Sequence, residues 1–395
     1  MPDTPAPDPA LAGQDAERWR RLFEAARAPG EPSPGGLLLT HVGDVVAASG
    51  YAPLVERGQS PFAWLDAVVV LWPDDAVLVV PDQEAAVAAV ANLLPRLATY
   101  PGYVYETPFD HRHRLLDVIL AEIAGHLRGG RGVLGVEPDS LPASLAEAIG
   151  ARFPALRTVD VTGRLAWARA VKDAAEIARL RRAFVVADAM HAEVRRRARA
   201  GTPEVEVYSA AKAAGERESG GRMALHADLL AGPRTAETGG DPGVRTLQDG
   251  DLVMADLAPR VGGYWADTCS ATSVGPPTKE QLRVSGIVRA ALERGIEHAR
   301  PGVPAADLDR FLRDEMARAG YAYPHHSGHG VGTTFHDEPR IVPYERRPLA
   351  EGMVLCLEPG AYVDGWGGIR WEVGVLVRSD GPEVLSRFPL ELAPD

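Results

Sequence analysis

Cysteine is almost absent from this chain: Cys269 and Cys356 are the only two among 395 residues. Two isolated cysteines provide neither a disulfide framework nor a cysteine-rich zinc site, and such sparse use is typical of a reducing compartment. An excess of positive charge is also lacking, because the formal net charge at pH 7 is -12. A chain this acidic offers no basic surface to nucleic acid or to an anionic membrane, so we expect neither as a partner.

Long hydrophobic runs are missing too, and no apolar stretch approaches the length of a membrane span. The first residues read MPDTPAPDPALAGQD, with acid and proline where a signal peptide has basic residues followed by an apolar run. We therefore expect a cytoplasmic protein with a disordered leader over residues 1–20. An apolar fraction of 46% and a charged fraction of 24% predict an ordinary globular protein.

The chain is too long for one ordinary core, so two domains are expected. From about residue 35 to 162, β-branched runs alternate with helical patterns, which predicts a small α/β domain over residues 21–165. Within it, the segment AVVVLWPDDAVLVVP predicts a hairpin, because Pro73, Asp74 and Asp75 favour a turn between two apolar runs.

The second predicted domain spans residues 166–395. A long amphipathic pattern over residues 167–201 predicts one helix at its start. Two further helices are expected near residues 279–299 and 304–319, and strand-like segments precede and follow them.

Four carboxylates of the second half lie in strand-like apolar runs, where an ionised group is costly. They are Asp256, Asp267, Glu358 and Glu372. Carboxylates in such places are paired, protonated or bound to a cation. Ten residues, including Pro259 and two glycines, separate Asp256 from Asp267, so a hairpin would bring both side chains together. Two like charges at that distance repel unless a cation lies between them.

Four of the eleven histidines fall within the twelve residues HHSGHGVGTTFH. Glycines flank His329 on both sides, which lets the backbone turn sharply and approach a site, so His329 is the candidate metal ligand. His336 is expected to donate a hydrogen bond or carry a proton toward the substrate. His325 is expected either to support the ligands or to face the substrate, and His326 to be peripheral.

Four carboxylates and one imidazole make a ligand set composed mostly of oxygen. That set suits two divalent metal ions, with Mn favoured and Co or Zn as alternatives, better than a structural zinc. A single aspartate in a strand is more often at an edge or in an ion pair, but these five side chains together favour metal. Two ions that share bridging carboxylates hold and activate a water between them.

These motifs make the second half resemble the M24 metallopeptidases of the pita-bread fold, which include prolidase, aminopeptidase P and methionine aminopeptidase. The family pattern runs D-x10-D, H-x2-G-H-G-x-G-x3-H-[ED]-x-P, G-M-x4-E-P-G-x-Y and G-[VI]-R-x-E. This chain has the two spaced aspartates, HHSGHGVGTTFHDEP, GMVLCLEPGAY and GIRWE. The first half resembles the creatinase/prolidase N-terminal domain, and this two-domain form points to the Xaa-Pro group.

The resemblance implies a mixed α/β (α+β) fold: a small N-terminal α/β domain, then a pita-bread catalytic domain with an antiparallel sheet and flanking helices. It implies metal ligands at five positions, namely Asp256, Asp267, His329, Glu358 and Glu372. The implied activity is hydrolysis of the amide bond of short peptides, above all Xaa-Pro, through attack by a metal-bridging hydroxide. A homodimer is also implied.

The resemblance assigns further roles around this ligand set. Glu358 would also accept the proton of the bridging water, and His336 would contact the substrate carbonyl, with His325 as a third catalytic candidate. Arg370 would face the substrate carboxylate, since a planar guanidinium binds a carboxylate through two hydrogen bonds.

One stretch differs from the family pattern, which has S-G-x-N-x4-H before the first aspartate. Here the stretch reads AGPRTAETGGD, with Gly239 in place of the histidine and Arg234 in place of the asparagine. His226 lies too far upstream to replace that histidine without a rearranged loop. We expect Arg234 to compensate by binding the substrate, or the substrate to have changed. Two alternatives stay open: an M24-fold hydrolase of a non-peptide small amide or compatible solute, and a non-catalytic binding protein with a degenerate site.

Overall fold

The computed structural model describes residues 12–27, 33–55, 65–106 and 111–393. The chain forms two compact units, of which the first ends at Arg169 and the second begins at Ala170. The boundary predicted near residue 165 falls inside helix α6 (Thr162–Ala170). Helix α1 (Ala12–Ala25) occupies residues 12–20, where the sequence predicted a disordered leader, and residues 1–11 lie outside the described part.

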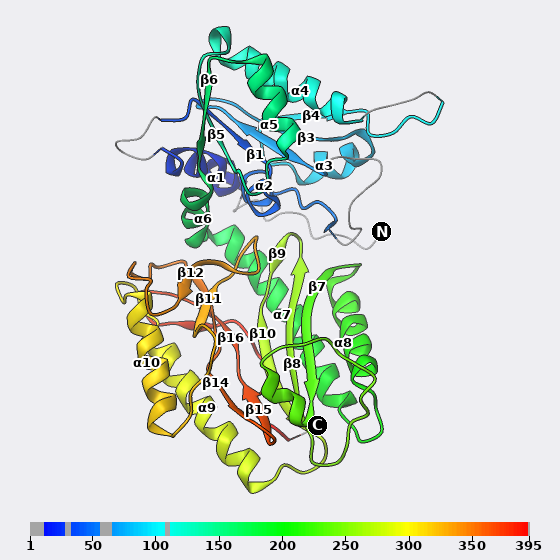
Figure 1. The fold of residues 1–395 in the computed structure, drawn as a ribbon, viewed down its shortest axis with the longest axis vertical. Coiled ribbons are helices and arrows are strands. Elements are labelled where there is room, and N and C mark those ends of the chain that lie inside the picture. The colour runs from blue at the N-terminus through cyan, green and yellow to red at the C-terminus, as the bar shows by residue number, and fades with distance from the viewer. Residues whose placement is uncertain (1–11, 28–32, 56–64, 107–110, 394–395) are drawn as a thin grey trace. The chain divides into compact units, whose positions relative to one another are not determined.

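The first unit is built on a mixed six-stranded sheet in the order β4-β3-β2-β1-β5-β6 (Figure 1). Its strands are β1 (Gly36–Leu39), β2 (Val68–Leu71), β3 (Ala76–Pro81), β4 (Arg96–Tyr100), β5 (Gly132–Val136) and β6 (Leu156–Asp160). Its helices, besides α1 and α6, are α2 (Val42–Ser49), α3 (Ala85–Ala91), α4 (His111–His126) and α5 (Ala143–Arg152). The α/β pattern predicted for this half is therefore confirmed.

Both faces of this sheet are buried, which explains why its strands read as continuous apolar runs. Val69 and Leu71 belong to the apolar cluster that contains residues of α1 and α2, whereas Val68 and Val70 belong to the cluster with α4 and α5. Strands β2 and β3 pair antiparallel with Leu71 opposite Ala76, which confirms the predicted hairpin.

The second unit contains antiparallel sheets with helices on both sides (Figure 1). One sheet has the order β10-β8-β7, with β9 paired to β8, and the other has the order β12-β11-β13-β16-β17. The strands of the first sheet are β7 (Ala224–Ala231), β8 (Leu252–Val261), β9 (Tyr264–Trp265) and β10 (Thr268–Ser273). Those of the second are β11 (Gly328–Gly330), β12 (Asp337–Ile341), β13 (Val354–Leu357), β16 (Val373–Leu376) and β17 (Glu383–Val384). Strands β14 (Gly360–Val363) and β15 (Gly367–Arg370) form a separate hairpin.

Two pairs of helices flank these sheets. Helices α7 (Ala174–Arg197) and α8 (Glu204–Ser219) pack on β7 and β8. Helices α9 (Lys279–His298) and α10 (Ala305–Arg318) contact strands of the other sheet, as Figure 1 shows. Within the described ranges, no helix combines the length and apolar character needed to cross a membrane.

The prediction of a single long helix at the start of the second half is wrong, because the chain forms two helices there, α6 and α7. Asp173 caps the start of α7 by accepting the Glu176 N–H at 2.9 Å, and the Glu176 carboxylate accepts the Asp173 N–H at 3.0 Å. This reciprocal capping box satisfies two backbone donors, and it holds Asp173 in an extended conformation that interrupts the helix.

A buried histidine joins α7 to β10. His191 is fully buried, with its Nε2 3.0 Å from Thr268 Oγ1 and its Nδ1 2.8 Å from Ser270 Oγ. Burial lowers the pKa of His191 to about 3 because the charged imidazolium loses its hydration. This folded-state pKa lies below the value of an exposed histidine, so the stability that depends on neutral His191 is lost as pH falls below about 6.5.

We expect His191→Gln to reduce the acid sensitivity of the protein. The variant should have a lower Tm than wild type at pH 7, because the packing is altered, yet its Tm should fall less between pH 6.5 and pH 4. Thermal unfolding of both proteins across that range measures the difference, with His298→Gln on α9 as the matched control. Parallel loss of Tm in wild type and the His191 variant would contradict this role.

Candidate metal centre

The two sheets of the second unit bring the five predicted metal ligands together. Asp256 lies within β8, Asp267 just before β10, His329 in the middle of β11, Glu358 just after β13 and Glu372 just before β16. Strands β8 and β10 pair antiparallel with Asp256 opposite Cys269, which confirms the predicted hairpin. A backbone bridge between Cys269 and Glu372 links the sheets at this point.

His329 lies at the centre of the cluster. Its Nε2 is 3.5 Å from Asp267 Oδ2, 3.7 Å from Glu372 Oε1 and 3.9 Å from Glu358 Oε1. These four residues are at most 6% exposed. Asp256 is more accessible, with a side chain 19% exposed. Nε2 of His329 therefore faces three buried carboxylates, at distances longer than a hydrogen bond.

The second ring nitrogen of His329 fixes its tautomer. Nδ1 lies 2.8 Å from the Gly330 carbonyl oxygen, which can only accept, so Nδ1 carries a proton. Nε2 is then the nitrogen directed at the carboxylates, and its lone pair would be free for a bound cation once that nitrogen has lost its proton. The flanking glycines allow close strand packing here. A β-carbon on Gly328 would lie 2.2 Å from the Cys356 oxygen, and one on Gly330 would lie 2.2 Å from the Glu338 oxygen.

The buried carboxylates of the cluster repel one another, and their pKa values show this repulsion. Burial, followed by the charge of Asp256, raises the pKa of Asp267 to about 7, and burial with Asp267 raises the pKa of Glu372. Burial also opposes ionisation of Glu358, but the adjacent His326 and Arg370 outweigh it and lower its pKa to about 2. Bound cations would relieve this repulsion.

An unsatisfied atom indicates where a cation would fit. Oε1 of Glu372 is buried and has no hydrogen-bond partner among the described residues. A buried carboxylate oxygen without a partner is costly. Oxygen atoms from carboxylates with one imidazole nitrogen form a set that divalent ions accept. The residues present therefore fit a divalent-metal site.

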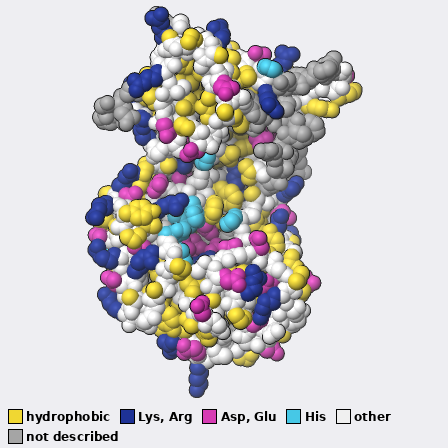
Figure 2. All heavy atoms as spheres, viewed as in Figure 1, with side chains coloured by type: hydrophobic (Ala, Val, Ile, Leu, Met, Phe, Trp, Pro, Cys, Tyr) yellow, Lys and Arg dark blue, Asp and Glu magenta, His cyan; other side chains and the backbone are white. Residues whose placement is uncertain are grey.

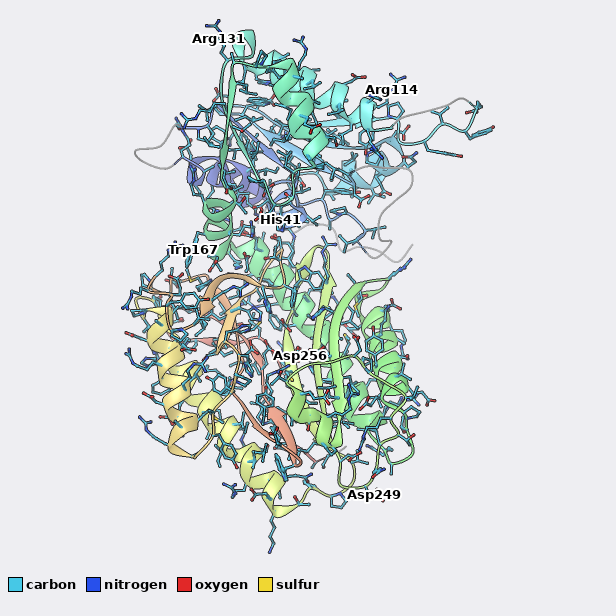
Figure 3. All side chains as sticks on the ribbon, in the orientation of Figure 1. His41, Arg114, Arg131, Trp167, Asp249 and Asp256 are labelled. Carbon is cyan, nitrogen blue, oxygen red and sulfur yellow. The ribbon has the colours of Figure 1, made fainter. Side chains whose placement is uncertain are left out.

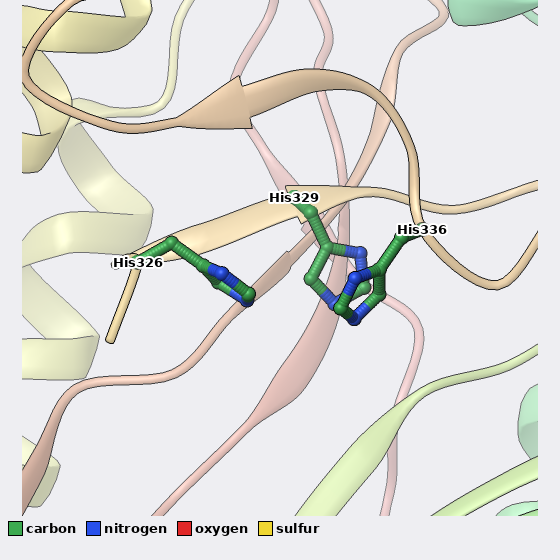
Figure 4. Close-up of side chains that lie close together, drawn as sticks. All are labelled: His326, His329 and His336. Atoms are coloured by element: carbon green, nitrogen blue, oxygen red, sulfur yellow. The ribbon is translucent and has the colours of Figure 1, made fainter. Parts of the chain in front are cut away.

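Three histidine rings face one another beside this cluster (Figure 4). The ring centres of His329 and His336 are 4.0 Å apart, and His326 lies 5.4 Å and 5.2 Å from them. Nitrogen donors of all three lie within 4.8 Å of one another. The peripheral position predicted for His326 is wrong, because its Nε2 is 2.8 Å from Glu358 Oε1.

His325 and Arg370 are held by a chain of hydrogen bonds through one tyrosine. Arg370 Nη1 donates to Tyr362 Oη at 3.0 Å and to the Thr238 carbonyl at 2.6 Å. Nδ1 of His325 lies 2.8 Å from the His326 carbonyl oxygen, so Nε2 accepts the Tyr362 hydroxyl proton at 2.9 Å.

Arg370 is also paired with a predicted metal ligand. Its Nη2 donates to Asp256 Oδ2, and its side chain is only 5% exposed. The guanidinium of Arg370 therefore binds groups of the chain itself, whereas we expected it to face a substrate carboxylate.

The ligand cluster opens into a cavity of about 260 Å³. Its walls are formed by His226, Asp228, Thr238, Gly239, Asp256, Asp267, His325, His326, His329, Phe335, His336, Glu358, Arg370 and Glu372. Figure 2 shows histidine and acidic side chains gathered around this hollow on the second unit, and Figure 3 labels Asp256, one of the lining residues. The volume is near the lower end for ligand pockets, which favours a small ligand.

Arg234 does not reach this cavity, which corrects the prediction that it binds substrate. Its Nη1 donates to the buried carboxylate of Glu204 at 2.6 Å, and its Nε lies 3.7 Å from Glu237. Arg234 is absent from the residues that line the pocket. It therefore holds the loop before Gly239 to helix α8 instead of replacing the missing histidine.

Two pocket residues on β7 were missed from the sequence. His226 and Asp228 on β7 both line the cavity, although we expected His226 to lie too far away. The ring of His226 packs 4.8 Å from that of Phe335. The two residues are separated by one position in a strand, so period-two alternation places them on one face. That alternation is the signal that could have found them.

Comparison with known proteins agrees with this site. Residues 178–379 match metallopeptidase family M24, and residues 38–171 match the creatinase/prolidase N-terminal domain. A probable dipeptidase PepE of Mycobacterium bovis is 32% identical over 389 residues, covering 96% of this chain and 97% of the relative. A Xaa-Pro dipeptidase of Pyrococcus horikoshii is 30% identical over 261 residues, covering 66% and 74%.

The fold is shared with solved structures as well. The Xaa-Pro dipeptidase from Bacillus anthracis superposes with a TM-score of 0.80 over 97% of this chain and 99% of its own, at 24% identity. The two-domain form with a pita-bread catalytic unit is thereby confirmed. This chain belongs to the M24 metallopeptidase family and is a peptidase. Members of this family use divalent metals, which agrees with the donor set described above.

Proposed function

We propose that this peptidase cleaves short Xaa-Pro peptides, with two divalent metal ions at the carboxylate cluster. The observation that carries the proposal is the buried ring of Asp267, Glu358 and Glu372 around the His329 nitrogen. The proline preference is supported by relatives that are named Xaa-Pro dipeptidase. The small cavity supports a dipeptide or another short peptide.

Five side chains would hold the ions: Asp256, Asp267, His329, Glu358 and Glu372. When bound, such ions supply Lewis acidity and lower the pKa of a water molecule. The mostly oxygen donor set supports Mn, with Co or Zn as alternatives. To bind an ion, Asp256 would give up its contact with Arg370.

The remaining pocket residues would act on the peptide. His326 and Arg370 lower the pKa of Glu358, so its carboxylate is ionised at neutral pH. It would accept the proton of the attacking water, which bound ions would make more acidic. His336 would donate to the peptide carbonyl oxygen as negative charge develops there. His325 would position Tyr362 and Arg370 through the hydrogen bonds described above. Contact of Arg370 with a substrate carboxylate would require release of one of its present partners.

Two broader properties complete the proposal. We infer a homodimer from the family resemblance, which sedimentation velocity would test. A cytoplasmic location is supported by Cys269 and Cys356, both buried and free.

The function is tested by assaying the Mn-loaded protein on three peptides. These are Leu-Pro, a tripeptide that begins with Leu-Pro, and Leu-Ala as a control without proline. We expect at least about a tenfold preference for proline in kcat/KM, a difference of about 1.4 kcal/mol. Equal rates on Leu-Pro and Leu-Ala would refute the proline preference. Absence of hydrolysis with every peptide would refute peptide cleavage and favour a non-peptide amide or a binding role.

The contact between His326 and Glu358 leads to a further prediction. We expect His326→Ala to reduce kcat/KM about 10- to 100-fold, because partners that orient a metal ligand typically have effects of that size. His326 helps lower the pKa of Glu358. Its loss should therefore move the acidic limb of the pH profile to higher pH.

The matched variant is His326→Gln, whose amide N–H can still donate and should restore part of the rate. The measurements are kcat/KM as a function of pH and metal content by mass spectrometry. Unchanged activity and an unchanged profile in His326→Ala would return His326 to the peripheral role first expected.

A further inference from the structure

Strand β7 adds a carboxylate to the pocket that the metal centre does not use. Asp228 lies directly opposite Asp256 in the β7–β8 register, and both line the cavity. The family motifs that define the metal ligands do not include this position. Because two side chains opposite each other on antiparallel strands lie close together, Asp228 adds a negative charge beside the ligand cluster.

Asp228 has no ion-pair partner among the described residues. The Gly240 N–H donates to it, and Arg370 and His226 act on it only through longer-range charge. Its carboxylate lines the cavity next to Asp256, so it is open to a ligand that enters the pocket.

The loop that lacks the family histidine is fitted around this carboxylate. A β-carbon on Gly239 would lie 2.6 Å from Asp228 Oδ2, so no larger residue fits unless Asp228 moves. Thr238 adopts a positive φ of 64°, which is rare for a residue other than glycine, and its carbonyl accepts from Arg370 at 2.6 Å. Strain of this kind occurs at functional sites, and here it falls beside Gly239, whose backbone lies against Asp228.

The geometry of the pocket indicates what Asp228 can bind. Two divalent ions would carry as many positive charges as Asp256, Asp267, Glu358 and Glu372 carry negative ones. Asp228 is the one other carboxylate among the lining residues, and among the described residues no cationic side chain forms an ion pair with it. The aromatic ring of Phe335, packed on His226, lines the same cavity and also favours a cation.

We propose that Asp228 is a specificity-determining residue that binds a protonated nitrogen of the peptide, an inference that rests on the proposed peptidase function. The nitrogen is either the free α-amino group or the side-chain amine of a basic first residue. Both are cations that form a charge-assisted hydrogen bond with a carboxylate.

The test compares wild type with Asp228→Asn, which keeps the shape of the side chain and removes its charge. The control is Asp249→Asn, the same change at an exposed position that Figure 3 shows far from Asp256. The substrates are Leu-Pro, Lys-Pro and their N-acetylated forms. Kd is measured by calorimetry with each peptide in the Mn-loaded proteins, alongside kcat/KM and metal content.

We expect Asp228→Asn to lower kcat/KM about 10- to 100-fold for the peptide whose cation Asp228 binds, the range for a hydrogen bond to a charged group. If Asp228 binds the α-amino group, the substitution should lower kcat/KM equally for Leu-Pro and Lys-Pro, and the acetylated peptides should bind weakly to wild type and to Asp228→Asn alike. If Asp228 binds the side-chain amine, the substitution should lower kcat/KM only for Lys-Pro and its acetylated form.

Several results would overturn the inference. One is an unchanged kcat/KM and Kd for all four peptides. Another is an equal loss for every peptide, including acetyl-Leu-Pro, which carries no cation. A fall in metal content would make Asp228 a ligand. If wild type hydrolyses none of the peptides, the proposed function fails, but the calorimetric comparison still tests Asp228.

Discussion

Replacing Asp267 with asparagine is expected to abolish peptide hydrolysis and, at the same time, to stabilise the metal-free protein. Asp267 is 4% exposed and its carboxylate lies 3.5 Å from His329. Without it the cations lose a ligand, so hydrolysis should fall by at least about 10³-fold. In the metal-free protein, the same change removes one charge from a cluster of mutually repelling carboxylates.

The pH dependence of this effect has a definite sign. Burial and the charge of Asp256 raise the pKa of Asp267 from 3.8 to about 7 in the folded protein. The folded state therefore holds its proton more tightly than the unfolded state. The stability associated with that proton is complete below pH 3.8 and is lost as pH rises through about 7. The Asp267→Asn variant should not lose this stability as pH rises.

Thermal unfolding at pH 5 and pH 8, with chelator and with Mn, measures both parts of the prediction. Wild type should gain Tm on addition of Mn, whereas Asp267→Asn should start higher in chelator at pH 8 and gain less. Asp249→Asn serves as the control for a change of charge at the surface. Full metal content and full turnover in Asp267→Asn would show that the site is wrongly assigned.

His336→Ala is expected to keep the metal but to lose about 10²- to 10³-fold in kcat. Burial, with the charges of His329 and His326, lowers the pKa of His336 to about 3, so this imidazole is neutral at neutral pH. A neutral ring can donate one hydrogen bond to the carbonyl oxygen of the peptide. His329→Ala, in contrast, should lose metal, because His329 directs its Nε2 at three carboxylates.

The two histidine variants are separated by metal content and single-turnover rate measured on the same preparations. His336→Gln keeps an N–H donor and should recover part of the rate. If His336→Ala and His329→Ala lose metal to the same extent, His336 is a ligand and its assignment as a hydrogen-bond donor is wrong.

The metal cluster could be predicted because each of its residues carries a local signature. Asp256, Asp267, Glu358 and Glu372 are charged residues in apolar strands, and His329 lies between glycines. Burial makes such positions costly, so the sequence alone points to a shared cation. The structure brings all five together around one space, although their roles as ligands remain predictions.

The pocket wall could not be predicted in the same way, because its contacts depend on loops and on side-chain direction. Arg234 was expected at the substrate, but it pairs with Glu204, which lies on another helix. His326 was expected to be peripheral, but its ring turns toward Glu358. Neither contact follows from the spacing of residues along the chain.

The break between α6 and α7 illustrates a different limit. The apolar periodicity continues through residues 171–173, so it predicts one helix. A capping box formed by Asp173 and Glu176 separates the two helices. The D-x-x-E spacing was visible in the sequence, but periodicity and capping signals conflicted, and here the cap decided the structure.

The central claim, a dinuclear metal centre that performs peptide hydrolysis, is tested most directly by metal titration of the chelated protein. Metal bound per chain and Leu-Pro hydrolysis would be measured on the same samples as Mn is added. The account predicts that activity rises with metal and that binding saturates at about two ions per chain. Full hydrolysis by protein that has been exhaustively stripped of metal would contradict it.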